Sequence, residues 1–481
     1  MKTSVTIFVI ICFFLPNTFS QKAGDILWTQ PFLQEEDMTN LDRLKFGYLI
    51  IPENYDEPEG KLFKMAFVII KAQIQAAEKD AVLYFMGGWG SAAIKNLDFY
   101  KNNFLSYKRD LIIFDYRGSG YSQPQLCPDL GEAVYQNVLA DLGYAKFQEE
   151  QKVLMADCLN QLRENKLDMH QFGSDTKARD AILLAEKLGY ESYNLFGVSY
   201  GTKTILQYVR QSTDKIRSLI LDSNCPLDYP INSAMISDYA QSFQKIIAAC
   251  KADEKCAAKY PKLKENYLKL LNSLETKPLK VKLPKNEVLY LNRQEMNAVI
   301  HQLLYLENFY PYLPKIIHKF SKRNKLYLNR VIRNIPQLLK ANYNGLGLIN
   351  YVYDHKAFQA EALEKYEESM NKYPAFELFD GYLAYFLTDE IFRQQPYQLP
   401  QIEVPSLILA GAFDPTTPTY YSQRLLPYFK QKYYYEFPNT GHGVTDNYCG
   451  RQLTDAFLFD PINFEEPACL KRLEKEKINF R

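Results

Sequence analysis

A serine lies between two glycines at the end of an apolar run, in the segment LFGVSYGTK (residues 195–203). This Gly-x-Ser-x-Gly pattern has two interpretations. Gly and Ser are common in ordinary turns, so the pattern alone does not identify a reactive serine. The alternative is a nucleophile elbow, a strained turn between a strand and a helix that exposes the Ser199 hydroxyl. The elbow requires a strand before Ser199, a helix after it, and then an acid and a histidine in that order.

The residues around Ser199 meet the local requirement. The apolar run YNLFGV (193–198) is typical of a buried strand, and YGTKTILQYVRQ (200–211) carries aliphatic residues at helical spacing. A sharp turn here leaves the backbone N–H of Tyr200 at a helix N-terminus, where negative charge develops on a tetrahedral intermediate. We expect this N–H to be one donor of an oxyanion hole.

The second donor is expected in a glycine-rich segment, FMGGWGSAA (85–93), which directly follows the predicted strand AVLY. We assign it to the backbone N–H of Gly88. A plain glycine-rich turn before a helix is the alternative. A phosphate-binding loop is disfavoured because no Gly-Lys-Ser/Thr follows.

A serine hydroxyl needs a base, and His442 is the predicted one. It stands in NTGHGVTDN (439–447), among small residues after the last predicted strand, where an imidazole can project over the sheet edge. The other four histidines suit surface or packing positions: His170, His301, His318 and His355.

The acid that orients the histidine is predicted to be Asp414, in LAGAFDPTTP (409–418), directly beyond a predicted strand. The rival is Asp222, at the end of SLILD. Asp414 could also cap a following helix, which does not exclude catalysis. The order Ser199, Asp414, His442 is the one that a nucleophile-elbow fold uses.

Eight short apolar runs predict the strands that must position these residues, and a helical pattern at 175–189 lies among them. Because strands and helices alternate, we predict an α/β fold with a mostly parallel sheet of about eight strands flanked by helices. The predicted strands are 47–51, 65–70, 81–86, 111–115, 193–198, 218–222, 405–410 and 433–437.

The alternation stops near Pro226 and resumes at residue 405. Between them the sequence reads as amphipathic helices rich in Tyr and Lys. We interpret 229–395 as a helical lid inserted between two parts of the sheet domain, 21–228 and 396–481.

The N-terminus carries one charge, Lys2, then an apolar run from Val5 to Pro16 and small residues before Gln21. This pattern is typical of a secretory signal peptide over residues 1–20, so we expect export to a periplasm or to the outside of a cell. No later apolar stretch is long enough to predict a membrane span.

The charge balance gives no support for nucleic-acid binding, because 57 basic and 56 acidic residues nearly cancel. No cysteines and histidines lie at zinc-ligand spacing. We therefore expect no metal and no cofactor.

Of eight cysteines, Cys12 lies in the predicted signal peptide and seven remain. An exported chain favours disulfides. The spacing suggests Cys127–Cys158, Cys250–Cys256 and Cys449–Cys469, which leaves Cys225 as a small buried apolar residue rather than a catalytic thiol.

Several stretches of the predicted sheet domain resemble the prolyl aminopeptidase and tripeptidyl aminopeptidase family of serine peptidases, within the α/β-hydrolase superfamily. They are FGYLIIPENYDEPEGK (46–61), DYRGSGYSQP (115–124), the region 178–210 around Ser199, LAGAFDPTTP, and NTGHG with the following Cys-Gly. The resemblance implies an α/β-hydrolase fold, an acyl-enzyme at Ser199, and short peptides with free N-termini as substrates. It also implies that acidic lid residues hold the substrate ammonium group.

One departure concerns the oxyanion loop. Where the family has His-Gly-Gly-Pro-Gly, this chain has Met86, Gly87, Gly88, Trp89 and Gly90. The shaping glycines are kept, whereas Trp89 brings a large ring near the expected substrate site. Two alternatives to an exported aminopeptidase stay open: an esterase on the same three residues, and a binding protein that kept the fold but lost catalysis.

Overall fold

The computed structural model describes residues 21–32, 41–74, 78–332, 344–356, 359–378, 397–473 and 477–481. The predicted signal peptide, 1–20, and parts of the predicted lid lie outside these ranges.

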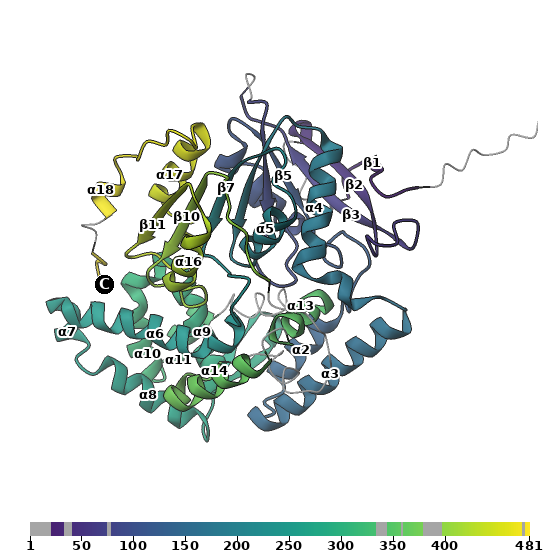
Figure 1. The fold of residues 1–481 in the computed structure, drawn as a ribbon. Coiled ribbons are helices and arrows are strands. Elements are labelled where there is room, and N and C mark those ends of the chain that lie inside the picture. Colours follow the sequence, from purple (N-terminus) through teal and green to yellow (C-terminus); the bar gives the residue numbers. More distant parts are fainter. Residues whose placement is uncertain are drawn as a thin grey trace, which may run out of the picture.

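A nine-stranded sheet forms the centre of the molecule, with the order β1-β2-β3-β5-β4-β6-β7-β10-β11 (Figure 1). The six strands from β5 to β11 run parallel, and β1, β2 and β3 extend the sheet in antiparallel pairs. All eight predicted strands form, so the predicted α/β fold with a mostly parallel sheet is confirmed; β1 was not predicted. The bounds are β1 Ile26–Thr29, β2 Leu44–Pro52, β3 Leu62–Ile70, β4 Ala81–Phe85, β5 Asp110–Phe114, β6 Tyr193–Val198, β7 Ile216–Asp222, β10 Ser406–Gly411 and β11 Lys432–Phe437.

Both faces of the sheet are covered, which explains why its central strands are apolar throughout. Alternate residues of β4 face opposite sides: Leu83 and Phe85 pack in one core, and Val82 and Tyr84 pack in the other. The first core includes helices α4 (Ser174–Leu188) and α5 (Tyr200–Gln211), and the second includes α17 (Tyr448–Phe459). The short helices α1 (Leu97–Tyr100), α16 (Thr419–Leu425) and α18 (Leu470–Leu473) complete this part of the chain.

Between β7 and β10 the chain forms helices that gather at one end of the sheet (Figure 1). They are α6 Ile231–Ala252, α7 Glu254–Lys259, α8 Leu263–Leu274, α9 Arg293–Tyr305, α10 Leu313–Ser321, α11 Lys325–Ile332, α13 Gly345–Lys356 and α14 Gln359–Lys372. This segment also contains an antiparallel pair that was not predicted, β8 (Leu279–Lys282) with β9 (Val288–Leu291). The lid boundaries at 229 and 395 stay a prediction.

The helices from α6 to α14 form a helical layer. Two further helices, α2 (Leu130–Leu139) and α3 (Tyr144–Glu164), lie beside it, although they come from the segment between β5 and α4 (Figure 1). The Tyr135 hydroxyl donates a 2.6 Å hydrogen bond to Glu287, next to β9. The helical layer is therefore built from two separate parts of the chain.

Three disulfides join the cysteine pairs that the spacing suggested: Cys127–Cys158, Cys250–Cys256 and Cys449–Cys469. Cys225 is buried and forms no disulfide with another cysteine in the described ranges. Within the described ranges, no helix combines the length and the apolar character that crossing a membrane requires.

The loop after β5 is fixed by a buried ion pair. Arg117 contacts Asp180 of α4 through two nitrogens, at 2.6 and 2.5 Å, and both side chains are almost fully buried. The remaining guanidinium protons reach the carbonyls of Pro52, Glu53 and Gln171. Because every donor is used, the desolvation cost of this charge is offset by hydrogen bonds.

Replacing Arg117 tests this pair. In Arg117→Ala the Asp180 carboxylate stays buried without its charged partner and keeps only the hydrogen bond from the Tyr55 hydroxyl, so we expect the free energy of unfolding to fall by about 3–5 kcal/mol in urea denaturation. Arg179→Ala is the control, because the ion pair that Arg179 forms with Asp56 lies at the surface, where the Asp56 side chain is 84% exposed. In Arg179→Ala the free energy of unfolding should fall by less than about 1 kcal/mol. Equal losses in the two variants would contradict this account of the buried pair.

Candidate active site

Ser199 lies at the sharp turn between β6 and α5, with φ 56° and ψ −127°. A non-glycine residue at positive φ is strained and is retained where surrounding packing enforces it. The two flanking glycines make the turn possible. A Cβ on Gly201 would overlap the Phe85 carbonyl oxygen, and one on Gly197 would lie 2.9 Å from the Gly201 carbonyl carbon. The predicted strand–turn–helix around Ser199 therefore forms.

The glycine-rich loop after β4 packs directly against this turn. Strand β4 pairs with β6, and Phe85 is the register partner of Gly197, so both strands end at the same level. A Cβ on Gly87 would lie 3.0 Å from the Ser199 Cβ. Gly88 has φ +82°, a conformation that favours glycine. Gly88, Ser199 and Tyr200 all line one cavity. The oxyanion-hole roles of Gly88 and Tyr200 stay a prediction.

Asp414 and His442 come together from the loops after β10 and β11. The His442 Nδ1 lies 2.8 Å from Asp414 Oδ2. Strands β10 and β11 are parallel neighbours, with Gly411 beside Phe437, so their following loops meet. A Cβ on Gly411 would overlap the Gly441 carbonyl oxygen, which shows how closely the two loops approach.

Two threonines beside Asp414 complete its hydrogen bonds. Asp414 Oδ1 accepts from the backbone N–H groups of Thr416 and Thr417, each at 2.8 Å. The Thr417 hydroxyl donates to Asp414 Oδ2 at 2.7 Å and lies 3.1 Å from His442 Nδ1. The two backbone bonds resemble the capping alternative considered from the sequence, and they coexist with the histidine contact.

These contacts shift the pKa values of Asp414 and His442 in opposite directions. Burial by itself would raise the pKa of Asp414, but His442 and the hydrogen bonds lower it to about 2. Burial by itself would lower the pKa of His442, but the Asp414 carboxylate raises it above the ordinary value of 6.5. Asp414 is therefore an anion at neutral pH, and it favours the imidazolium that forms when His442 takes a proton.

Asp222, the rival acid, has a different set of contacts. Its carboxylate accepts from the backbone N–H groups of Val444 and Thr445, at 2.9 and 2.8 Å, and from the Thr445 hydroxyl at 2.7 Å. These residues lie two and three positions after His442. Asp222 therefore fixes the loop that carries His442, whereas Asp414 contacts the imidazole.

The helical layer holds the other side of the His442 loop. The His442 backbone N–H donates to the Tyr305 carbonyl at the end of α9, at 3.1 Å. Glu307 accepts from Thr440 and from Asn447 at 2.8 and 3.0 Å, so it bonds to this loop on both sides of His442.

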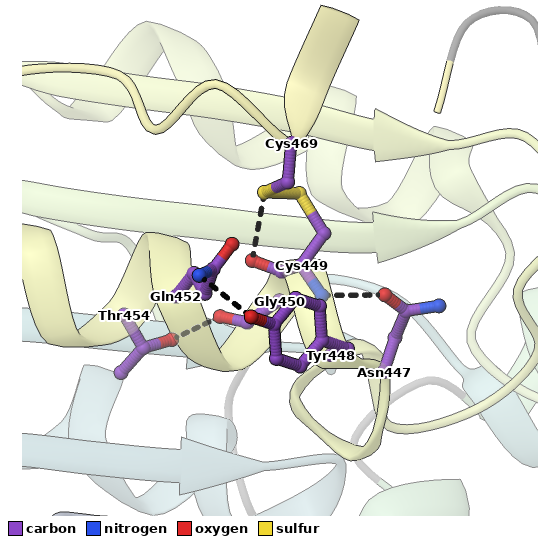
Figure 2. The surroundings of a disulfide bond; sticks show 7 residues. All are labelled: Asn447, Tyr448, Cys449, Gly450, Gln452, Thr454 and Cys469. Carbon is purple, nitrogen blue, oxygen red and sulfur yellow. Dashed lines mark hydrogen bonds between the residues drawn. A yellow bond between two sulfur atoms is a disulfide. The ribbon is translucent and has the colours of Figure 1, made fainter. Parts of the chain in front are cut away.

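Helix α17 begins at the end of this loop (Figure 2). The Asn447 side chain accepts from the Cys449 N–H at 2.8 Å, and the Cys449–Cys469 disulfide anchors the first turn of the helix. Asn447 thus joins the cap of α17 to Glu307. Sequence reasoning missed Glu307 and Tyr305, because no motif marks a contact between segments more than a hundred residues apart.

The cavity beside Ser199 has a volume of about 750 Å³. His442 and Cys225 also line it, and most of its surface is apolar, with nine aromatic residues among those that line it. Apart from histidine, the charged residues among the described lining residues are Asp446 and Arg451. Acidic lid residues were expected at the substrate. Among the lid residues that the structure describes, those that line the cavity are uncharged or histidine: Ile231, Met235, Ala298, His301, Gln302, Tyr305, Tyr351 and Leu378.

His301, expected at a surface or packing position, is buried at this cavity, with its Nε2 3.2 Å from the Thr416 hydroxyl. Burial lowers its pKa to about 4, so it is neutral at physiological pH. In the described ranges, no three side chains of the His, Cys, Asp and Glu types are grouped closely enough to hold a metal ion.

Comparison with known proteins gives a match to one family model and similarity to several serine peptidases. A family model described as the alpha/beta hydrolase fold matches residues 80–294, which include Ser199. The chain is 27% identical to a tripeptidyl aminopeptidase of Streptomyces lividans over 191 residues, 37% of this chain and 35% of the relative. It is 25% identical to the serine protease Hip1 of Mycobacterium tuberculosis over 222 residues, 44% of this chain and 42% of the relative.

The chain thus spans less than half the length of these curated relatives. Among solved structures, an esterase from Exiguobacterium antarcticum covers 82% of this chain and 94% of its own, at 14% identity and a TM-score of 0.37. The resemblance to tripeptidyl aminopeptidases that the motifs indicated is confirmed.

The two aspartates are expected to differ in their effect on His442. Asp414→Asn removes the carboxylate that raises the His442 pKa most, so the pH at which this imidazole is half protonated should move down. Asp222→Asn should lower this pH by less, and its main effect should be a lower free energy of unfolding. NMR titration of the histidine side chains measures both shifts, with the His442 signals assigned from His442→Gln. A larger downward shift in Asp222→Asn would reverse the assignment of the acid.

Proposed function

This chain has the α/β-hydrolase fold, and we propose that it is an exported serine peptidase that releases single residues or short peptides from free N-termini. The observation that supports the chemistry best is the 2.8 Å contact between His442 and Asp414, at a cavity that Ser199 also lines. A nucleophile at a strained elbow, a histidine base and a buried anion behind it are the parts that acyl transfer requires.

In the proposed reaction, His442 takes the Ser199 proton while the serine oxygen attacks the substrate carbonyl. Asp414 holds Nδ1, so Nε2 is the nitrogen that receives the proton. The Gly88 and Tyr200 N–H groups would stabilise the oxyanion of the tetrahedral intermediate. Collapse breaks the peptide bond, and His442 returns the proton to the leaving amine. Water then hydrolyses the acyl-enzyme by the same steps.

The choice of peptides as substrates is supported by the similarity to tripeptidyl aminopeptidase and to Hip1. The carboxylate of Asp446 supplies a negative charge at the cavity, where a substrate ammonium would be attracted. Export is supported by the sequence of residues 1–20 and by three disulfides, which persist in oxidising compartments.

An esterase on the same residues is the second candidate. The largely aromatic and aliphatic cavity wall favours it, because an apolar acyl group would bury well there. The two functions share Ser199 and differ in substrate.

Matched arylamides separate these functions. We expect the protein to hydrolyse alanyl, prolyl or tripeptidyl arylamides with free N-termini at least about 100-fold faster than blocked ones, since an ion pair to a buried ammonium contributes about 3 kcal/mol. Release of the arylamine is followed by absorbance. Ser199→Ala should abolish turnover. Ester hydrolysis without arylamide cleavage would support the esterase instead.

A fluorophosphonate probe tests the chemistry without assuming a substrate. We expect covalent labelling of Ser199 in the folded protein, detected by mass spectrometry, because the probe forms its bond only with an activated serine. Ser199→Ala is the control and should not label. A folded protein that stays unlabelled would support the binding-protein alternative.

A further inference from the structure

Helix α13 of the helical layer contacts the oxyanion loop at three points. Asn344, just before the helix, donates a 2.8 Å hydrogen bond to the Gly90 carbonyl. Asn350 donates a 3.1 Å bond to the Trp89 carbonyl. The Tyr351 ring lies 6.1 Å from the Trp89 ring, in an edge-to-face arrangement. Residues 89 and 90 are therefore held by a helix more than 250 positions further along the chain.

Asn350 also contacts the residue after the nucleophile. The Tyr200 hydroxyl donates a 3.0 Å hydrogen bond to Asn350 Oδ1. The Asn350 amide nitrogen has a second acceptor, the Leu346 carbonyl at 2.7 Å, and the side chain is fully buried. Since carbonyls only accept, the amide nitrogen must face Trp89 and Leu346, and the amide oxygen must face Tyr200.

We propose that Asn350 is a positioning residue that sets the geometry of the oxyanion hole by joining its two halves. One half is the Gly88 N–H in the loop that contains Trp89, and the other is the Tyr200 N–H. Asn350 touches neither N–H. It holds the segments that carry them, through the Trp89 carbonyl and the Tyr200 hydroxyl. This inference rests on the oxyanion-hole roles in the proposed function.

The oxyanion loop differs in sequence from that of the aminopeptidase family that the chain resembles, and this difference supports a positioning role for Asn350. The loop carries Trp89 where the family has proline. A proline fixes its own φ near −65° and stiffens a loop from within. With Trp89, the conformation must be held from outside, and Asn350 and Tyr351 supply those contacts.

Gly90 shows that the contact with α13 is close. A Cβ at this position would lie 2.7 Å from the Gly347 backbone nitrogen and would overlap the Asn344 amide oxygen. On the core side of the loop, the Tyr116 hydroxyl donates to the Met86 carbonyl at 3.1 Å. The loop is thus fixed at Met86 by the sheet domain and at Trp89 and Gly90 by α13.

The test compares Asn350→Ala with a matched control, Asn297→Ala. Asn297 is also fully buried in the helical layer; it accepts from the Tyr267 and Tyr239 hydroxyls at 3.0 and 3.2 Å and donates to the carbonyls of Ala375 and Glu377. None of these bonds reaches the oxyanion loop. Asn297→Ala deletes four hydrogen bonds and Asn350→Ala deletes three, so the control should lower the melting temperature at least as much.

We expect fluorophosphonate labelling of Ser199 to slow by about 10- to 100-fold in Asn350→Ala, because a small misplacement of catalytic groups costs up to about 100-fold. On any substrate that the wild type hydrolyses, kcat should fall while KM changes less than about 3-fold. Asn297→Ala should label at the wild-type rate. Equal labelling rates in the two folded variants would overturn the proposal.

Tyr200→Phe is the milder second variant, in case Asn350→Ala does not fold. It removes only the hydroxyl that bonds to Asn350 and keeps the backbone N–H. Labelling should slow, and the double variant should show less than the product of the two single effects, because both act on one contact. A wild-type labelling rate in Tyr200→Phe would overturn the proposal. Failure of the wild type itself to label would instead overturn the serine-hydrolase function.

Discussion

The parallel pairing of β6 with β4 on one side and β7 on the other constrains where Ser199 lies. Register places Phe85 beside Gly197 and Val198 beside Asp222, so three strands end at one level. Neighbouring strands are only about 4.8 Å apart. The loops that follow them must therefore share a small volume, and glycines are required where backbones meet. The remaining two loops enter the same volume from β10 and β11.

A second set of contacts comes from the helical layer, and it acts on both backbone and side-chain groups of the loops around Ser199 and His442. Tyr305 and Glu307 hold the His442 loop, and Asn350 holds Trp89. The proposed nucleophile, base and acid are thus carried by the sheet domain, but the loops around them are held in place partly by helices outside it. The cavity lies between these two parts, so the helices that line it also supply contacts to the loops that carry Ser199 and His442.

The sheet and the position of the elbow could be predicted because their signals are local. An apolar run of five or six residues predicts a buried strand, and Gly-x-Ser-x-Gly gains meaning from the strand and helix on either side. Strand β1 was missed because it is short and partly exposed. The contacts of Glu307 and Asn350 were missed because a hydrogen bond between distant segments leaves no periodic pattern. The distinct contacts of Asp414 and Asp222 likewise emerge only from the folded loops.

The hydrogen bonds from α13 to the oxyanion loop limit how this chain could diverge. A lid that only shaped the cavity could be exchanged for another lid to accept another substrate, with the reactive groups unchanged. Here the exchanged segment would also have to supply a side chain that reaches the Trp89 carbonyl and the Tyr200 hydroxyl. With the proposed role of Asn350, substrate preference and turnover would be coupled in evolution and in engineering: lid grafts that ignore position 350 would change the rate of chemistry together with the specificity.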